Sequence, residues 1–291
     1  MAQPTPSLAV AVCTRNRPQR LRASLAALER EAAAGFDLVV VDQSEHPMPD
    51  GPVRVISDAG RGLSRARNVA LRETRSEWIA FVDDDCTVEE GFGRALLDEL
   101  SAHPEADWVS GNVGGNTTRS GDVPLVTTFR VDRERVRSGR WTLPGSIGYG
   151  VFFAVRRDVA ERLGGWDERL GPGVPDFPGA DDMDFAYRLL RSGGVALLSP
   201  RVRSMHEQWR TPEQVVALQG GYLRAWAGFA MKHLRSGDVA GGLWLWGWGL
   251  ADVLDMAKSA LGRRSRLRAR LAAAKLRGLA EGTAAGLRRR W

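Results

Sequence analysis

Apolar residues form short uninterrupted runs along the first half of the chain, separated by stretches in which they recur every three or four positions. The uninterrupted runs are typical of strands buried on both faces. They occur at 8–13, 36–41 and 77–82, and 53–57 is a further, short predicted strand. The recurring pattern predicts helices with one buried side, at 20–33 and 64–74. Strands and helices that alternate through short connections predict an α/β fold with a mostly parallel sheet flanked by helices.

The pattern is less regular after residue 115. Strands are expected at 108–115, 148–155 and 195–199, and helices at 157–163 and 181–192. Segment 116–146 is rich in loops, and 171–179 is an irregular loop of glycine and proline. From residue 206 onward the chain is mostly helical. We therefore expect an α/β domain over 1–210 and a helical C-terminal extension over 211–291.

Composition and charge narrow the class of protein. A chain of 291 residues with 43% apolar content can form one large domain with an appendage. Two cysteines, Cys13 and Cys86, are too few for a disulfide framework, and we expect both to be small buried residues. The first seven residues lack the basic and apolar segments of a signal peptide. We expect a cytoplasmic protein.

Three consecutive acids, Asp83, Asp84 and Asp85, follow the apolar run at 77–82. Adjacent carboxylates repel one another unless a cation lies among them. A hard divalent ion such as Mg²⁺ or Mn²⁺ prefers oxygen ligands and bridges readily to phosphates. The triplet therefore indicates a metal site, and the alternative is a solvated acidic turn.

Thr14, Asp42 and Asp83 each stand at the end of a predicted strand. In open parallel sheets, ligands bind outside the carboxyl ends of the strands. We therefore expect these three residues to converge on one crevice.

A second acidic cluster, Asp181, Asp182 and Asp184, opens a predicted helix. A carboxylate on this entry turn can act as a general base toward an incoming hydroxyl. The alternative is helix capping, because acids near a helix N-terminus are stabilised by its dipole. His206, which follows a predicted strand and a turn, is either a metal ligand or a structural histidine.

Segment 60–68 combines turn glycines with Arg65, Arg67 and Asn68. Arginine suits phosphate recognition, and asparagine can cap a helix or bind a ligand. The alternative is a basic first helical turn on the protein surface.

Six motifs together resemble the family 2 glycosyltransferases with the GT-A fold. They are VAVCTRNRP at 10–18, VVVDQS at 39–44, GLSRARN at 62–68, FVDDD at 81–85, GGWDE at 164–168 and ADDMDF at 180–185. They follow the family's order and span roughly residues 7–210. The resemblance implies a nucleotide-binding half at about 7–115 and an acceptor half at about 116–210.

The resemblance also implies a role for each matching residue. Nucleotide-sugar binding is implied for Thr14, Arg15, Asp42, Arg65, Asn68, Asp83 and Asp84. Metal binding, to Mn²⁺ or Mg²⁺, is implied for Asp83, Asp85 and, through a shorter match, His206. Asp182 corresponds to the catalytic base of inverting members, and Asp181 stands where glutamate is more frequent.

The implied reaction is a single in-line displacement, in which an acceptor hydroxyl attacks the anomeric carbon and inverts its configuration. The acceptor would be a glycan, a lipid-linked sugar or a small molecule, in cell-surface glycan, glycolipid or natural-product biosynthesis. The sequence fixes neither the sugar, nor the base, nor the choice between monomer and homodimer.

The C-terminal extension has two unusual segments. Segment 239–251 is uncharged and holds Trp244, Trp246 and Trp248, but it is too short to span a membrane, which takes about 20 residues. From residue 263 onward there are ten Lys or Arg residues and one acid. An amphipathic, basic helix at 263–277 predicts peripheral attachment to the cytoplasmic face of an anionic membrane. The alternative is packing on the protein itself or in a dimer.

Two other functions fit part of the sequence. Segment 81–87 resembles the nucleophile motif of haloacid-dehalogenase-type phosphatases, which also require a lysine between the two acidic clusters. Every lysine here, Lys232, Lys258 and Lys275, lies after both clusters. A nucleic-acid-binding protein would use the basic tail for phosphate contacts, but the rest of the chain is slightly acidic and no fold that reads nucleic acid is evident, so we expect no nucleic-acid partner.

Overall fold

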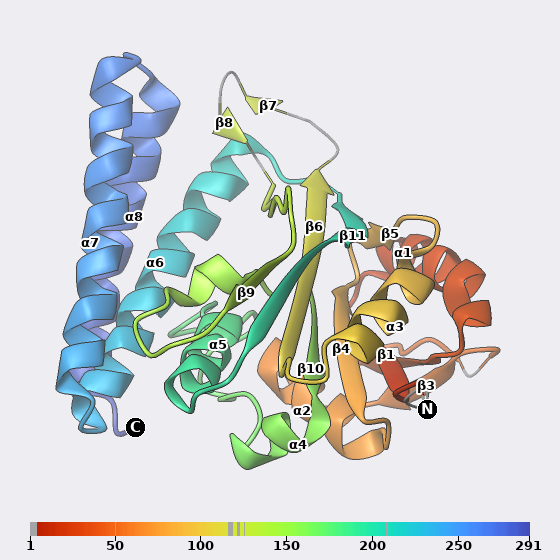
Figure 1. Ribbon diagram of the computed structural model, residues 1–291. Coiled ribbons are helices and arrows are strands. Elements are labelled where there is room, and N and C mark those ends of the chain that lie inside the picture. Colours follow the sequence, from red (N-terminus) through yellow and green to blue (C-terminus); the bar gives the residue numbers. More distant parts are fainter. Residues whose placement is uncertain (1–4, 50, 116–118, 121–122, 125, 208) are drawn as a thin grey trace. The chain divides into compact units, whose positions relative to one another are not determined.

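The computed structural model describes residues 5–49, 51–115, 119–120, 123–124, 126–207 and 209–291 (Figure 1). The chain divides into two compact units, which are described separately. The first comprises Met1–Thr117, Val126–Asp167 and Asp182–Gln208, and the second comprises Thr118–Leu125, Glu168–Asp181 and Trp209–Trp291.

The first unit begins with the predicted alternation of strands and helices. The strands are β1 (Leu8–Thr14), β2 (Asp37–Asp42), β3 (Arg54–Ser57) and β4 (Trp78–Asp83). The helices are α1 (Pro18–Glu31) and α2 (Leu63–Glu73), with a short 3₁₀ turn η1 (Ala32–Ala34) after α1. The strands pair in parallel in the order β3-β2-β1-β4. The α/β fold with a largely parallel first half is therefore confirmed.

The second half of this sheet mixes directions. Its strands are β5 (Cys86–Val88), β6 (Trp108–Gly115), β9 (Arg135–Arg137), β10 (Phe152–Arg156) and β11 (Ala196–His206). β10 runs antiparallel to both β4 and β6, and β5 and β9 run antiparallel to β11. In the described residues the sheet has nine strands, in the order β3-β2-β1-β4-β10-β6-β11-β5 with β9 beside β11. Two further short strands, β7 (Arg119–Ser120) and β8 (Val123–Pro124), pair with each other.

The sequence prediction was wrong in several details of this half. The strand expected at 148–155 begins only at Phe152, because residues 144–147 form a 3₁₀ turn, η2 (Pro144–Ile147), and Gly148 has a positive φ of 120°. β11 continues beyond residue 199 to His206, which is therefore part of a strand. Helix α3 (Phe92–Ala102) was not predicted, although its apolar residues follow helical spacing.

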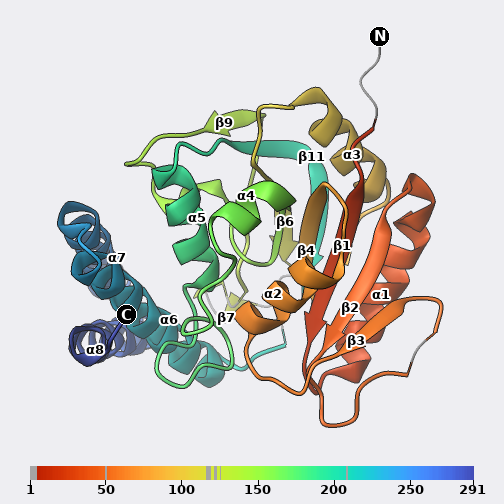
Figure 2. The same ribbon diagram turned by 90° about the horizontal axis from the view of Figure 1, so that it is seen from below.

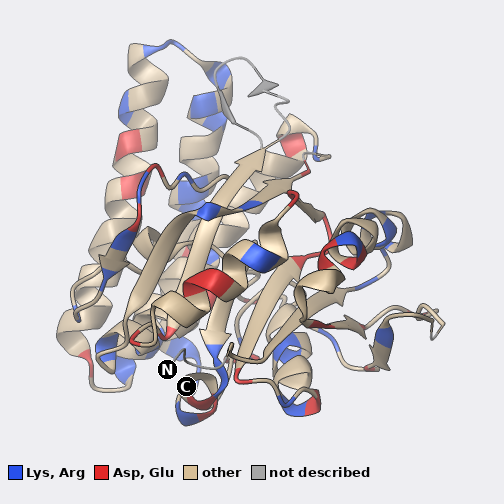
Figure 3. Cartoon of the chain, turned by 45° about the vertical axis from the view of Figure 1, so that its right-hand side comes forward, with Lys and Arg blue, Asp and Glu red and all other residues tan. Residues whose placement is uncertain are grey.

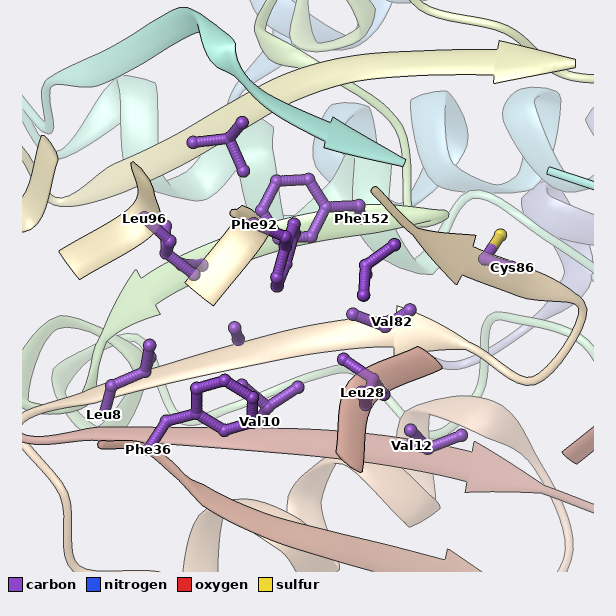
Figure 4. Close-up of a cluster of buried hydrophobic side chains, with 14 of the residues drawn as sticks. Leu8, Val10, Val12, Leu28, Phe36, Val82, Cys86, Phe92, Leu96 and Phe152 are labelled. Atoms are coloured by element: carbon purple, nitrogen blue, oxygen red, sulfur yellow. The ribbon is translucent and has the colours of Figure 1, made fainter. Parts of the chain in front are cut away.

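Helices cover both faces of the sheet (Figure 2). α1 and α3 pack on one face, where Leu8, Val10 and Val12 of β1 meet Leu28 and Phe92 (Figure 4). The opposite face packs against α2, α4 (Arg157–Arg162) and α5 (Asp181–Arg191). Because both faces are buried, β1 and β4 are almost continuously apolar rather than alternating.

In the second unit, α6 (Pro212–Arg235), α7 (Val239–Gly262) and α8 (Arg266–Arg288) pack side by side (Figure 1). A Cβ atom at Gly278 or Gly282 would lie only 2.1 Å from a backbone oxygen of α6, so α6 and α8 approach closely because these residues lack side chains. Trp246 donates a hydrogen bond to Thr283 across α7 and α8, so this tryptophan is used within the bundle.

The basic tail predicted at 263–277 lies mostly in α8, and Figure 3 shows Lys and Arg along the helices of this unit. Its buried face includes Leu271 and Lys275, whose ammonium group pairs with Asp252 at 2.8 Å. Within the described residues, no helix has the length and apolar character needed to cross a membrane.

Candidate active site

The strand ends predicted to converge do lie together. Thr14, the last residue of β1, pairs with Asp42 of β2, and Cys13 beside it pairs with Asp83 of β4. The chain then turns directly into β5, so the acidic triplet lies at the carboxyl edge of the parallel strands. This is the edge at which ligands bind in open α/β sheets.

The middle acid of the triplet is held by the protein. The carboxylate of Asp84 is buried, and it accepts hydrogen bonds from the Thr14 hydroxyl at 2.7 Å and from the Arg17 guanidinium at 3.0 Å. Burial raises the pKa of Asp84, and the Arg17 charge and the Thr14 hydrogen bond oppose that shift. Asp84 therefore fixes the loop after β1 against the acidic turn. Arg17 had not been singled out from the sequence.

Asp83 lies at the end of β4, near a buried arginine. Burial, together with the neighbouring Asp85 carboxylate, raises the pKa of Asp83 to about 8, although Arg67 counteracts this shift. The Arg67 guanidinium is 3.9 Å from the Asp83 carboxylate and lies over the rings of Phe81 and Phe153. A carboxylate in such surroundings is stabilised by a further cation.

Asp85 and His206 are far apart in the sequence but lie side by side, because Asp85 directly precedes β5 and β5 pairs with β11. His206 ends β11 and pairs with Cys86 of β5, which places its Nε2 atom 3.3 Å from the Asp85 carboxylate. Its Nδ1 atom lies 3.1 Å from the Thr127 carbonyl oxygen. If Nδ1 carries the proton and donates it there, Nε2 keeps a lone pair toward Asp85, which is the arrangement of a metal-bound imidazole.

Burial lowers the pKa of His206, but its contact with Asp85 and the nearby Asp83 charge outweigh this and raise the pKa. The Cys86 sulfur lies near the same pair, and burial raises its thiol pKa well above the usual value. A cavity of about 280 Å³ adjoins the group and is lined by Asp85, Cys86 and His206, and by Ser24 of α1. The oxygen and nitrogen atoms here fit a divalent cation.

The predicted base, Asp182, lies in the first turn of α5. One of its oxygens accepts a hydrogen bond from the Gly150 amide at 2.6 Å, and the other accepts one from the Met183 amide at 2.8 Å. The Gly150 carbonyl in turn accepts a hydrogen bond from Arg67 at 2.9 Å. A single residue, Gly150, therefore connects Asp182 to the arginine beside Asp83.

The other acids of this cluster have separate environments. Asp184 is fully buried and accepts a hydrogen bond from Arg188 at 2.8 Å, which indicates a structural role. Asp181 is also buried.

A family model described as glycosyl transferase family 2 matches residues 9–164, which is more than half of the chain. The chain belongs to glycosyl transferase family 2. The resemblance inferred from its motifs is thereby confirmed, and this membership favours glycosyl transfer over the phosphatase interpretation.

Two curated relatives match this family 2 glycosyltransferase over much of its length. The succinoglycan biosynthesis protein ExoM of Rhizobium meliloti is 29% identical over 84% of this chain and 77% of its own. An uncharacterized glycosyltransferase of Haemophilus influenzae is 23% identical over 63% of this chain, and the match spans only 62% of that protein.

Solved structures share the GT-A fold. The mannosyltransferase PcManGT from Pyrobaculum calidifontis, in complex with GDP-Man and Mn²⁺, has a TM-score of 0.61 at 17% identity, covering 99% of this chain and 88% of its own. Residues 1–349 of S. aureus TarS have a TM-score of 0.54 at 16% identity, covering 96% and 90%. At these identities the similarity establishes the fold.

Several residues predicted to bind the nucleotide contact the protein itself in this glycosyltransferase. The Asp42 carboxylate accepts hydrogen bonds from the Ser44 and Met48 amides at 2.8 and 2.9 Å, which shapes the loop after β2. Arg15 is half-buried, and we find no side-chain hydrogen bond from it within the described part of the chain.

Arg65 forms a two-pronged pair with Asp58, with its closest contact at 2.9 Å. Asp58 also accepts a hydrogen bond from Gln43, whose carbonyl oxygen accepts one from the Gly62 amide. The neighbouring Arg67, rather than Arg65, approaches the acidic triplet. In the sequence, the feature that pointed to Arg67 was its place in the motif at 62–68.

Asn68 joins two segments that are almost a hundred residues apart. Its amide nitrogen donates to the Trp166 carbonyl at 2.9 Å, and its oxygen accepts from the Trp166 amide at 2.8 Å. Trp166 is buried against Phe81 and Phe185. This geometry gives Asn68 a structural role, whether or not it also contacts a nucleotide.

We expect Asn68→Ala to destabilise the protein without any nucleotide present. The substitution removes the hydrogen-bond partners of the Trp166 amide and of the Trp166 carbonyl. Each buried group left unpaired costs about 1–3 kcal/mol. Urea unfolding measures the loss, with the exposed helix residue substitution Gln19→Ala as the control. Unchanged stability combined with weakened nucleotide binding would instead assign Asn68 to the ligand alone.

Proposed function

We propose that this protein is a metal-dependent, inverting glycosyltransferase that moves a sugar from a nucleotide donor to an acceptor hydroxyl. The observation that carries the proposal is the grouping of Asp83, Asp85 and His206 at the carboxyl edge of the sheet, linked through Arg67 and Gly150 to Asp182. A structural neighbour that carries GDP-Man and Mn²⁺, and another, GalNAc-T7, that carries UDP, GalNAc and Mn²⁺, support it.

Asp85 and His206, with Asp83, are the residues that would hold Mn²⁺ or Mg²⁺. The Asp85 carboxylate lies 3.3 Å from the His206 Nε2 atom. This separation and the raised pKa of Asp83 both suit a shared cation. When bound, the ion offsets negative charge on the departing diphosphate. Arg67, a buried permanent cation near Asp83, reinforces the positive potential at the same edge.

The nucleotide itself would occupy the strand edge formed by the loops after β1 and β2 and by the start of α2. We assign its binding to Thr14, Arg15, Asp42, Arg65, Asn68, Asp83 and Asp84. Because Asp42 and Asp84 are largely engaged by the protein, their contribution would be to shape these loops, and Arg15 offers a half-buried guanidinium to the ligand.

Asp182 would serve as the base. The Gly150 and Met183 amides each donate a hydrogen bond to its carboxylate and fix the orientation of that carboxylate. It would take the proton from the acceptor hydroxyl as that oxygen attacks the anomeric carbon on the face opposite the diphosphate. The bond to the diphosphate breaks in the same step, so the anomeric configuration inverts. The match to ExoM, a succinoglycan biosynthesis protein, favours a glycan as the acceptor.

The donor site is tested by thermal unfolding with UDP, GDP, dTDP, CDP and their sugars, with and without Mn²⁺. We expect one nucleotide to stabilise the protein in a metal-dependent manner, by about 2.7 kcal/mol when the ligand is at a hundred times its Kd. Asp85→Ala and His206→Ala should abolish the shift, whereas Asp37→Ala, at the exposed start of β2, should keep it. Folded protein that responds to no nucleotide contradicts the proposal.

We expect Asp182→Asn to lower kcat by ~10²–10⁴-fold, the usual contribution of a general base. The donor and metal identified by the thermal assay should still stabilise the variant, because Asn has the same size. The exposed substitution Asp158→Asn serves as the control. Near-normal turnover by folded Asp182→Asn protein would assign the base to another residue.

We also propose that the C-terminal unit attaches the enzyme peripherally to an anionic membrane surface. One side of α7 exposes Leu243, Leu254 and Leu261, which are 56%, 50% and 81% exposed. Lys258 and Arg263 are exposed nearby along the same helix and at its end. Apolar side chains flanked by cations are typical of interfacial helices.

Flotation with vesicles tests this attachment on the full-length protein. We expect binding to phosphatidylglycerol-containing vesicles and little binding to pure phosphatidylcholine, because each nearby Lys or Arg contributes ~1 kcal/mol at an anionic surface. The pair Leu254→Ser and Leu261→Ser should weaken binding, whereas Val136→Ser, an equally exposed residue of β9, should not. The attachment is contradicted if all variants float equally well with the vesicles, or if no protein floats with them.

A further inference from the structure

A second group of metal-ligating side chains lies in the first unit, apart from the donor site. It comprises Glu99 of α3, His103, which directly follows that helix, and Glu134, just before β9. The Nε2 atom of His103 is 3.6 Å from a Glu99 carboxylate oxygen and 3.5 Å from a Glu134 carboxylate oxygen. The three candidate ligand atoms all lie within 4.8 Å of one another.

This group is separate from the Asp85 and His206 pair. Glu99 contacts Ser199, which pairs with Gly111 of β6, whereas His206 pairs with Gly115. Four residues of strand, or about 13 Å, lie between these two positions. A cation in one site therefore cannot share ligands with the other.

The distances favour a shared cation over direct hydrogen bonds. An N–H···O hydrogen bond normally spans about 2.7–3.2 Å, so contacts of 3.5 and 3.6 Å are too long. Zinc binds imidazole nitrogen and carboxylate oxygen at about 2.0–2.2 Å in a tetrahedral arrangement, which places neighbouring ligand atoms about 3.4 Å apart. The observed separations from Nε2 match that spacing.

The orientation of His103 also suits a ligand. Its Nδ1 atom lies 3.2 Å from a Glu105 carboxylate oxygen. A proton on Nδ1, donated to Glu105, leaves the Nε2 lone pair facing Glu99 and Glu134. A carboxylate that orients a histidine in this way is the usual outer partner of a metal-bound imidazole.

Glu99 is unusual because it is a buried carboxylate, with its side chain only 2% exposed. Its Oε1 atom accepts a hydrogen bond from the Ser199 hydroxyl at 2.9 Å and lies 3.4 Å from Arg201. Its Oε2 atom faces His103, and within the described ranges it accepts no hydrogen bond. A carboxylate with so little exposure to water is stabilised by a nearby cation.

We propose that Glu99, His103 and Glu134 form a second divalent metal site that prefers Zn²⁺. One imidazole and two carboxylates are a ligand set that zinc accepts, and a water molecule can complete the tetrahedron on the exposed side of Glu134. The bound ion joins the end of α3 to the segment before β9. Both elements lie beside β11, so the site stabilises the strand that carries His206.

The test measures Zn²⁺ bound to full-length protein by equilibrium dialysis and thermal unfolding. The background variant Asp85→Ala with His206→Ala removes the donor-site ligands, so failure of the proposed function does not affect the result. We expect one Zn²⁺ per chain in this background and a zinc-dependent rise in Tm. Cobalt(II), used in place of zinc, should give the intense visible absorption of a tetrahedral site.

Variants of the cluster decide the assignment. In the same background, Glu134→Gln, on an exposed side chain, should remove the zinc-dependent rise in Tm, and Glu105→Gln should weaken zinc binding by about 10–100-fold through its effect on His103. The control Glu29→Gln, on the exposed side of α1, should change neither. Absence of zinc binding in the background, or binding unaffected by Glu134→Gln, overturns the proposal.

Discussion

The backbone of Gly150 connects the two acidic clusters of the active site. Its amide donates to Asp182 and its carbonyl accepts from Arg67, whose guanidinium approaches Asp83. A Cβ atom at this position would lie 2.9 Å from the Arg67 guanidinium and 3.1 Å from the Asp182 carboxylate. A side chain at this position would therefore require the Arg67 guanidinium and the Asp182 carboxylate to shift. The antiparallel strand β10 positions Gly150, since the Asp83 amide donates a hydrogen bond to the carbonyl of the next residue, Val151.

Electrostatic repulsion within the acidic triplet is relieved in different ways at each position. Asp84 points inward to Thr14 and Arg17, so its charge is compensated by the protein. Asp83 is compensated by Arg67 at 3.9 Å, and Asp85 by Arg17 at 3.8 Å and by the titratable His206. The triplet thus combines one acid held by short hydrogen bonds with two whose arginine partners are more distant, and these two gain most from a bound cation.

The sequence allowed the first half of the sheet to be predicted because its strands are buried on both faces and end at polar residues such as Thr14 and Asp42. It could not show which group each polar side chain contacts. Asn68 and Arg65 carry the residue types of a ligand site, yet Trp166 and Asp58 engage them. These partners are distant in the chain or depend on the course of a loop, so no local pattern reports them.

The position of His206 depends on an irregularity that spacing alone does not reveal. Ser199 pairs with Gly111 but Arg203 pairs with Asn112, so three extra residues of β11 bulge outward. Because side chains alternate between faces, an odd insertion exchanges the faces of all later residues. Gly111 permits the bulge, since a Cβ there would lie 2.2 Å from the Val202 carbonyl, and Asn112 donates to the Pro200 carbonyl within it. Without this change in register, His206 would present its side chain to the opposite face, away from Asp85.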